Sequence, residues 1–329
     1  GNLIARYVDR CNLLPLVHPP GALYSYSNSA FVTAGRLVEV IRGISWYQAM
    51  EDYIFTPLGM NHALADPKKM ICYRAAMGHL WNDEGWKCSP LPWLPLGMAP
   101  CGTTPTMNAS DLILFARAFL DDGHTPSGKS WLSESSIQAM QHREICLPRI
   151  SQHIRRYAGL GWGIREYHPE RRLIYGHTGA TYGFYSSLQI CPDQHAAFAL
   201  LINGAAPRAL ETVQNDLARE VFGIELQEEP AIDHSAPLTS QQRLIIGHYE
   251  SMDKLIDISE RNNQLVARLE YKIDPLPAED LTLYPKSDEC YACETTDGTR
   301  RSSWAFIMDN GLTSPPTYLF DGSRLNPRC

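Results

Sequence analysis

The sequence predicts an α+β protein with two domains: an antiparallel sheet flanked by helices in residues 1–225, and a small all-β barrel in residues 239–329. Three observations lead to this fold class. Helical periodicity dominates the first 142 residues, and short β-branched and aromatic segments follow it. A linker with little periodicity, 226–238, then separates this part from a stretch that reads as strands throughout. The chain has 329 residues, 44% of them hydrophobic, which is enough for two cores.

Five segments of the first domain have helical signals. Apolar residues recur at helical spacing between Asn28 and Ile41, and Gly43 provides the expected C-terminal stop. These apolar residues are Phe31, Val32, Ala34, Leu37, Val38 and Ile41. Capping residues and periodicity predict further helices at 45–54, 110–120, 133–142 and 207–222.

The strands follow from short segments separated by turn residues. The first domain is expected to contain antiparallel strands at 157–165, 172–177, 182–190 and 196–203. In the second domain, hairpin turns are expected at Asn262-Asn263, Asp297-Gly298 and Asn310-Gly311. About eight strands in roughly ninety residues indicate a closed or nearly closed barrel.

Composition excludes several classes of function. The net charge of −7 argues against a nucleic-acid partner, which needs a basic surface. The longest apolar runs are far too short to cross a membrane. Nine cysteines without regular spacing indicate mostly free thiols in a reducing compartment, so we expect a cytoplasmic protein. The single C-x-x-C, Cys290 to Cys293, lacks a second pair of ligands, and neither a metal nor another cofactor is expected.

Three stretches carry a more specific signal. They are Pro20-Gly-Ala-Leu-Tyr-Ser-Tyr-Ser-Asn28, Tyr157-Ala-Gly-Leu-Gly-Trp-Gly163 and Tyr175-Gly-His-Thr-Gly-Ala-Thr-Tyr-Gly-Phe184. Each of them alone is weak, because Y-x-N also reads as a helix cap and H-T-G as the end of a strand. Because the three stretches occur together and in this order, the chain resembles the serine β-lactamase, D-Ala-D-Ala carboxypeptidase and esterase superfamily, in its class C and peptidase S12 branch. That superfamily has the signatures S-x-x-K, Y-x-N and K/H-T-G.

The resemblance implies a fold and a set of site residues. The first domain would be β-lactamase/transpeptidase-like, lacking its N-terminal part, and the barrel would be lipocalin-like. Tyr26 would relay a proton to the leaving group, and Asn28 would bind the acyl side of the substrate. His177 and Thr178 would line a strand beside the substrate, and Gly179 would allow its close approach. The backbone N–H of Ala180 would form half of the oxyanion hole.

The serine nucleophile of this mechanism is not found in the chain. In the superfamily the S-x-x-K helix precedes Y-x-N by several tens of residues, whereas 25 residues precede Tyr26 here. The one S-x-x-K, from Ser251 to Lys254, follows both other signatures and is interpreted as a coincidence. Cys101 is a conceivable substitute, although a small buried residue is the favoured interpretation.

The sequence therefore leaves three functions open. The first is a serine hydrolase that acts on a small ester, amide or peptide through an acyl-enzyme, with its nucleophile in a segment absent from this chain. The second is an acyltransferase or thioesterase of secondary metabolism, which would use the same residues. The third is a binding protein that has lost catalysis. In the first case this chain alone is expected to be inactive, and the missing N-terminal segment could be a separate chain that covers exposed apolar surface.

Overall fold

The structure is a computed structural model, and it describes the chain except residues 1, 83, 205–206, 228, 230, 235–236, 274–275, 296–297, 299–300 and 310–313. The chain divides into two compact units. The first comprises Gly1–Pro15, Ser27–Glu144 and Tyr157–Leu226. The second comprises Leu16–Tyr26, Ile145–Arg156 and Gln227–Cys329, so that two short segments from the N-terminal half belong to the C-terminal barrel.

The first unit contains the predicted helices. The α-helices are α1 (Leu3–Val8), α2 (Asn28–Arg42), α3 (Trp46–Met50), α4 (Thr56–Leu58), α5 (Ala109–Leu120), α6 (Glu134–Gln141) and α7 (Pro207–Phe222). Shorter 3-10 turns lie at Cys11–Leu13, Pro67–Cys72, Leu96–Cys101 and Pro192–Gln194, and a π-helical turn at Glu51–Phe55 continues α3. The helices expected at 28–41, 45–54, 110–120, 133–142 and 207–222 are thereby confirmed.

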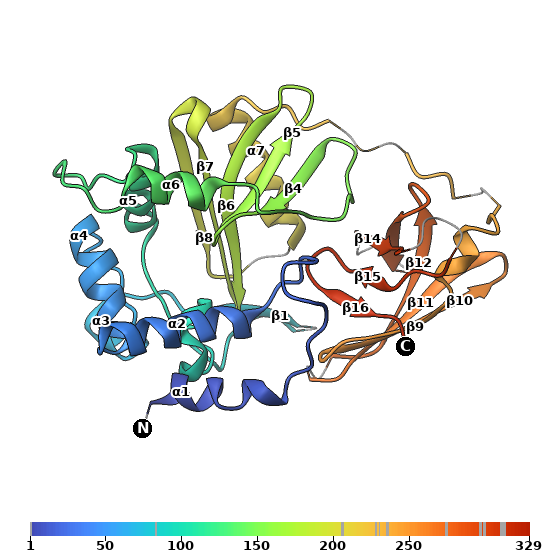
Figure 1. The fold of residues 1–329 in the computed structure, drawn as a ribbon, viewed down its shortest axis with the longest axis horizontal. Helices are drawn as coiled ribbons and strands as arrows, with labels where there is room; N and C mark the ends of the chain where they lie inside the picture. Colours follow the sequence, from blue (N-terminus) through green and yellow to red (C-terminus); the bar gives the residue numbers. More distant parts are fainter. Residues whose placement is uncertain are drawn as a thin grey trace. The chain divides into compact units, whose positions relative to one another are not determined.

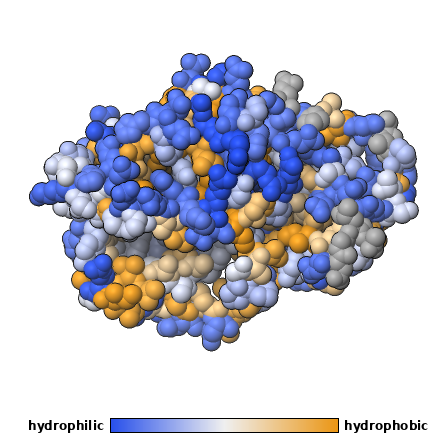
Figure 2. Space-filling model, turned by 45° about the horizontal axis from the view of Figure 1, so that its top comes forward, coloured by the Kyte–Doolittle hydropathy of each residue, from blue (hydrophilic) through white to orange (hydrophobic). Residues whose placement is uncertain are grey.

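Helix α2 buries a different face from the one that its apolar pattern suggests. Gly35 and Glu39 are buried with Val32, and Gly35 lies against Pro100, where a larger side chain would clash. The carboxylate of Glu39 is satisfied there, because it accepts hydrogen bonds from the Asn2 amide at 2.7 Å and the Trp46 backbone N–H at 3.1 Å. The apolar residues Phe31, Leu37, Val38 and Ile41 remain exposed. Apolar side chains reach the surface at several places among the hydrophilic ones on the face drawn in Figure 2.

The central sheet has the order β3-β4-β5-β6-β7-β8. Its strands are β3 (Ile145–Cys146), β4 (Ile154–Ala158), β5 (Gly163–Tyr167), β6 (Arg172–Thr181), β7 (Phe184–Cys191) and β8 (Ala196–Ile202). The single strand expected at 157–165 is wrong, because the chain turns between β4 and β5. Gly161 has a φ of +86°, a left-handed conformation that ends a strand and that glycine adopts without strain.

Helices cover both faces of this sheet (Figure 1). On one face, Phe119 of α5 packs in a cluster with Trp162 and Ile164 of the sheet region, and Ala197 and Ala199 of β8 adjoin this cluster. On the other face, Phe198 stacks on Phe222 of α7 with ring centroids 5.3 Å apart. Successive side chains of a strand point to opposite faces, so α5 and α7 lie on opposite sides of β8. A separate hairpin, β1 (His79–Asn82) with β2 (Gly85–Cys88), was not predicted.

The second unit is a nearly closed antiparallel barrel, as predicted. Its eight strands pair in sequence order: β9 (Gly247–Glu250), β10 (Lys254–Arg261), β11 (Gln264–Tyr271), β12 (Glu279–Pro285), β13 (Cys290–Thr295), β14 (Arg301–Ile307), β15 (Tyr318–Phe320) and β16 (Leu325–Pro327). A bridge between Tyr249 and Arg328 brings the last strand back to the first. The turn between β10 and β11 has positive φ at both Asn262 and Asn263, as predicted. The other two expected turns lie partly or wholly outside the described residues.

The two N-terminal segments of the second unit pack on the outside of its last strands. Val17, Leu23 and Tyr24 adjoin a cluster formed by Ala305, Phe320 and Leu325, and Leu147 and Ile150 join them. The barrel has its own interior, which contains Tyr249, Tyr291 and Phe306 among others. Among the described residues, no helix is long and apolar enough to cross a membrane.

Candidate functional site

Four of the six predicted site residues lie together on strand β6. His177, Thr178, Gly179 and Ala180 form the C-terminal part of this strand and pair in register with Leu188, Ser187, Ser186 and Tyr185 of β7. His177, Thr178 and Ala180 are exposed. The paired strand β7 therefore holds the backbone of this motif in an extended conformation.

The opposite edge of this segment is not covered by β5. The β5–β6 ladder begins at Arg172 and ends where Gly163 pairs with Gly176, one residue before His177. In the part of the chain that the structure describes, no strand pairs with that edge of residues 177–181. In an antiparallel strand, alternate residues direct their N–H and C=O groups away from a given neighbour. This edge can therefore accept an extended ligand by backbone hydrogen bonds.

The surroundings of His177 favour the neutral form of its imidazole. Packing around the imidazole lowers the pKa of His177 below its ordinary value; a hydrogen bond with the Thr178 backbone opposes this effect, and the Arg165 charge adds to it. The His177 side chain nevertheless reaches solvent. A neutral imidazole can both donate and accept a hydrogen bond, whereas a lysine at this position would present a fixed positive charge.

Two glycines on β6 have close neighbours. A Cβ at Gly179 would lie 2.5 Å from the Oγ of Ser186 on β7. A Cβ at Gly176 would clash with the backbone carbonyl oxygen of Leu188 and with the Gln189 side chain. The resemblance explained Gly179 only by access for the substrate. The packing of β7 is a second reason for glycine at this position.

Asn28 is the first residue of helix α2. Ser27 is its N-cap, and the Ser27 Oγ accepts a hydrogen bond from the Ala30 N–H at 3.2 Å. The Ser29 Oγ is hydrogen-bonded to the Tyr7 hydroxyl at 2.9 Å, which fixes this turn to α1. Asn28 itself is half-buried, on a rigid first helical turn.

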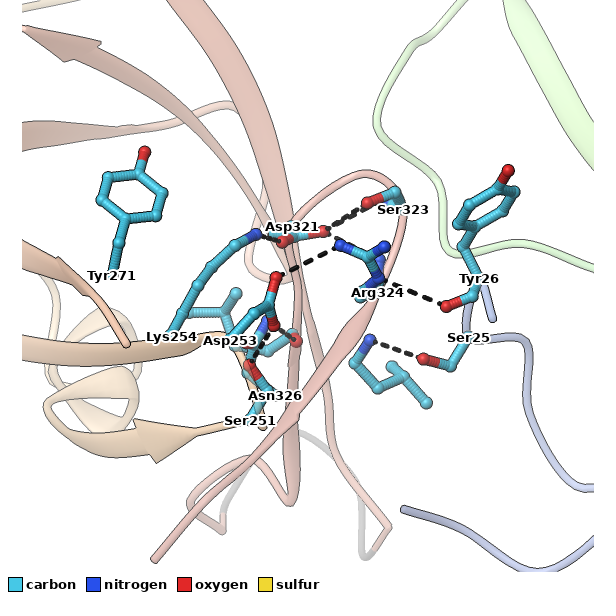
Figure 3. A network of polar contacts seen from close by, with 12 residues as sticks. Ser25, Tyr26, Ser251, Asp253, Lys254, Tyr271, Asp321, Ser323, Arg324 and Asn326 are labelled. Carbon is cyan, nitrogen blue, oxygen red and sulfur yellow. Dashed lines mark hydrogen bonds and ion pairs between the residues drawn. The ribbon is translucent and has the colours of Figure 1, made fainter. Parts of the chain in front are cut away.

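Tyr26 belongs to the second unit, whereas the other five predicted residues belong to the first. Its backbone N–H donates to the Ser323 carbonyl oxygen at 2.9 Å, and its carbonyl oxygen accepts from Nε of Arg324 at 3.3 Å. The Arg324 guanidinium also lies 5.7 Å from the centroid of the Tyr26 ring. One residue earlier, the Ser25 Oγ accepts from the Leu325 N–H at 3.2 Å (Figure 3). The segment 25–26 is thereby tied to the β15–β16 turn.

Sequence reasoning missed the residues that form this turn. Asp321, Ser323 and Arg324 match no signature, and no turn was predicted at their position. The contacts join residues about 300 positions apart in the chain, for example 298 between Arg324 and Tyr26. Nothing in local patterning indicates such a pairing.

The S-x-x-K of residues 251–254 has other partners in the structure. Ser251 and Lys254 lie at the turn between β9 and β10, where the Ser251 Oγ donates to the carboxylate of Asp253 at 2.8 Å. Lys254 forms an ion pair with Asp321. Each group is engaged by a carboxylate, so this pair does not have the arrangement of a nucleophile activated by a lysine.

Cys101 is not arranged as a reactive thiol, and the C-x-x-C pair is not arranged as a metal site. Burial raises the pKa of the Cys101 thiol, which disfavours the reactive thiolate. Cys290 and Cys293 are buried on β13, and their spacing on a strand directs them to opposite faces. Within the described residues, no three His, Cys, Asp or Glu side chains form a group that could hold a metal ion.

Comparison with solved structures shows the fold. The crystal structure of SurE superposes with a TM-score of 0.76 at 24% identity, over 100% of this chain and 74% of that chain. The octameric penicillin-binding protein homologue from Pyrococcus abyssi has a TM-score of 0.56 at 19% identity, over 94% of this chain and 66% of that one. The β-lactamase/transpeptidase-like fold is confirmed.

Comparison of sequences shows the family. The family described as Beta-lactamase matches residues 2–222, and the chain belongs to this family. Penicillin-binding protein 4 of Amycolatopsis lactamdurans is 35% identical over 226 residues, which are 67% of this chain and 57% of that protein. A beta-lactamase of Yersinia enterocolitica is 22% identical over 57% of this chain and 53% of its own length. The chain thus spans little more than half of the length of these two relatives.

Proposed function

We propose that this protein is a serine hydrolase that cleaves a small ester, amide or peptide through an acyl-enzyme. The single observation that carries the proposal is the edge of β6 at residues 177–181, which continues beyond Gly176, the last residue of β6 that pairs with β5. An acyl group bound along such an edge is held by the backbone, so its reacting carbonyl has a defined position. The same edge belongs to the H-T-G motif by which the chain resembles hydrolases of this family.

The residues have distinct roles in this proposal. The Ala180 N–H donates to the oxyanion that develops on the substrate carbonyl, and such a donor is worth about 3–4 kcal/mol of transition-state stabilisation. The neutral His177 and the Thr178 hydroxyl bind the polar end of the substrate beside it. Asn28 binds the acyl side, and Tyr26 transfers a proton between the nucleophile and the leaving group.

The nucleophile in this proposal comes from polypeptide outside residues 1–329. Two observations support this part: both groups of the only S-x-x-K contact carboxylates, and burial raises the pKa of Cys101. The serine attacks the substrate carbonyl, its proton passes to the leaving group, and water then releases the acyl group from the serine. The exposed apolar side chains of α2 are a surface that this additional polypeptide would cover.

An acylating probe tests the proposal. The product of the complete reading frame is treated with a fluorophosphonate, and its intact mass is measured before and after treatment. We expect one stoichiometric adduct, on a serine outside residues 1–329, and no adduct on the 1–329 chain alone. A full-length protein that takes up no label contradicts the hydrolase assignment. Label on Ser251 or Cys101 would place the nucleophile inside this chain.

A pair of tyrosine variants tests the proton-transfer role. In the full-length protein, Tyr26→Phe should lower kcat/KM by about 100- to 10,000-fold, the range of general acid–base catalysis. Tyr24→Phe is the matched control, because Tyr24 lies two residues away, adjoins the apolar cluster of the barrel and has its pKa raised by burial. Equal activity of the two variants would remove Tyr26 from the mechanism.

A further inference from the structure

We propose that the β15–β16 turn of the barrel, residues 321–324, is a positioning device for Tyr26, with Arg324 as its positioning residue. The inference rests on the proposed function, because it gives the barrel a task in that reaction. Four contacts carry it, and all of them lie within the second unit. Three of the four involve the backbone or the ring of Tyr26, and the fourth joins its neighbour Ser25 to β16.

The turn holds Tyr26 on both sides of its Cα atom. The Ser323 carbonyl oxygen binds the N–H, and Nε of Arg324 binds the C=O, so the peptide groups before and after Tyr26 are both fixed. The direction of the Cα–Cβ bond is therefore determined by the turn. Figure 3 shows the backbone of Tyr26 toward Arg324 and its phenol oxygen at the far end of the ring. The geometry suits a side chain whose tip must be placed accurately.

Asp321 makes the turn rigid. Its side chain is 7% exposed and accepts hydrogen bonds from the Ser323 N–H at 3.0 Å, the Ser323 hydroxyl at 3.1 Å and the Arg324 N–H at 2.8 Å. The ammonium of Lys254 compensates its charge. An aspartate that caps its own turn in this way restricts the backbone of the two residues whose N–H groups donate to it, here Ser323 and Arg324. Those two residues are the ones that bind Tyr26.

Arg324 is oriented by a carboxylate. Its Nη1 donates to Oδ2 of Asp253 at 3.2 Å, while its Nε reaches the Tyr26 carbonyl oxygen. A guanidinium presents donors in a fixed plane, so one contact orients the other. Lysine has a single flexible ammonium and cannot reproduce both contacts. The positive charge beside the ring also favours a tyrosine that carries negative charge during proton transfer.

A second arginine in the barrel, Arg328, makes contacts of the same kind that stay within the barrel. Arg328 lies 5.6 Å from the Tyr249 ring centroid and donates to the carbonyl oxygens of Leu244 at 2.9 Å and Ile246 at 2.6 Å. Its partners are part of the barrel or of the turn that precedes it. Arg324 makes the same kind of contact with a segment that precedes the barrel by more than 200 residues.

Hydrogen exchange on the 1–329 chain tests the contact without any activity. Arg324→Gln should increase amide exchange in peptides covering residues 20–28 by about tenfold or more, because the local opening free energy falls. Peptides from β10 to β13 should remain protected. Arg328→Gln is the matched control, and it should loosen β9 while leaving residues 20–28 unchanged. Equal exchange of residues 20–28 in wild type and Arg324→Gln overturns the inference.

Kinetics of the full-length protein test whether Arg324 affects catalysis. Arg324→Gln and Arg324→Lys should each lower kcat by about 10- to 100-fold with little change in KM, since misplacement of a group by 1 Å costs rate of that order. In Arg324→Gln the basic limb of the pH profile should also move to higher pH. If Arg324→Gln does not fold, Asp253→Asn should give a smaller loss of kcat in the same direction. Unchanged kcat in the folded variants overturns the inference.

The two proposals can fail separately. If Tyr26→Phe lowers activity and Arg324→Gln does not, the hydrolase assignment stands and the positioning role is wrong. If Tyr26→Phe leaves activity unchanged, the assignment of Tyr26 is wrong, and a positioning role in catalysis is lost with it. In that case the exchange experiment still reports whether the turn anchors residues 20–28.

Discussion

Lys254 and Asp321 form an ion pair between the first hairpin of the barrel and its last, with side chains that are 17% and 7% exposed. Burial alone would raise the pKa of Asp321, but the Lys254 charge and the hydrogen bonds from Lys254 and the turn N–H groups outweigh it, so this pKa lies below its usual range. An ionised aspartate is thus part of the folded barrel.

The stability of the barrel should therefore depend on pH through the ionisation of Asp321. Its pKa is lower in the folded than in the unfolded chain, where it is about 3.9. The stabilisation is present above that value and is lost as the pH falls through the folded pKa. Asp321→Asn should lower the free energy of unfolding by about 3 kcal/mol at pH 7, since it leaves a buried lysine without its partner.

Urea denaturation followed by tryptophan fluorescence measures this effect, since Trp304 is buried in the barrel. The difference between wild type and Asp321→Asn should shrink between pH 5 and pH 2. A difference that is constant over this range would show that folding does not lower the pKa of Asp321. Glu260→Gln, an exposed position paired with Arg243, serves as a control and should change stability by less than about 1 kcal/mol.

The two glycines of β6 should differ in their tolerance of alanine. At Gly176 the clash is with the backbone oxygen of Leu188, which is fixed by the sheet, so Gly176→Ala should cost about 2–3 kcal/mol. At Gly179 the obstacle is the Ser186 hydroxyl, which can rotate away, and the cost should stay near 1 kcal/mol. Thermal unfolding of both variants should show that Gly176→Ala is the less stable of the two.

A double variant tests the cause of the stability loss in Gly179→Ala. Adding Ser186→Ala to Gly179→Ala should restore most of the lost stability, because it removes the atom that a new Cβ would meet. The same addition should not rescue Gly176→Ala. Equal rescue of both glycine variants would contradict the packing explanation.

His177 should titrate below the ordinary value for histidine, about 6.5. Packing around the ring is the first cause of the lowered pKa of His177, and the Arg165 charge contributes in the same direction. An NMR titration of the imidazole signals of the 1–329 chain measures this pKa directly. Arg165→Gln should raise it, since a repelling charge is removed, whereas Arg155→Gln serves as a charge-matched control. A His177 pKa above 6.5 in the wild type would contradict the structure.

The lowered pKa of His177 also makes the stability of the first unit depend on pH. When the folded pKa of a histidine is lowered, the unfolded chain binds more protons around that pH. The first unit should therefore lose some stability as the pH falls below about 6.5, with no contribution from His177 above this value. Replacing His177 by Gln should flatten this part of the pH profile.

Helix α2 illustrates what local sequence can and cannot predict. Its extent followed from the apolar periodicity between Asn28 and Ile41 and from Gly43, which has the left-handed φ of 69° typical of a helix end. Its buried face did not follow, because apolar residues occur on both sides. Only the contacts of Gly35 with Pro100 and of Glu39 with Asn2 and Trp46 decide which side lies inside.

For the candidate site, too, the sequence predicts part of the local structure but not the long-range contacts. Of the H-T-G motif only His177 fell within a predicted strand, 172–177, whereas β6 continues to Thr181. That the motif begins one residue after the last pairing with β5 could be seen only from the register of the sheet. For Tyr26 the local motif was visible, but its partners Ser323 and Arg324 were not, since hydrogen bonds to backbone atoms depend on no particular side-chain pattern in the partner segment. Long-range pairing of this kind is determined by the assembled barrel.

The distance along the chain between Tyr26 and its turn has a consequence for biosynthesis. Arg324 lies 298 residues after Tyr26, so the ribosome must add all of these residues after Tyr26 before the two can meet. Contacts so distant in sequence form late in folding, after the local helices and hairpins. The motif that emerges early from the ribosome acquires its final conformation only after the last hairpin has been made. A nascent chain that stalls before residue 321 would therefore carry the Y-x-N motif without the turn that fixes it.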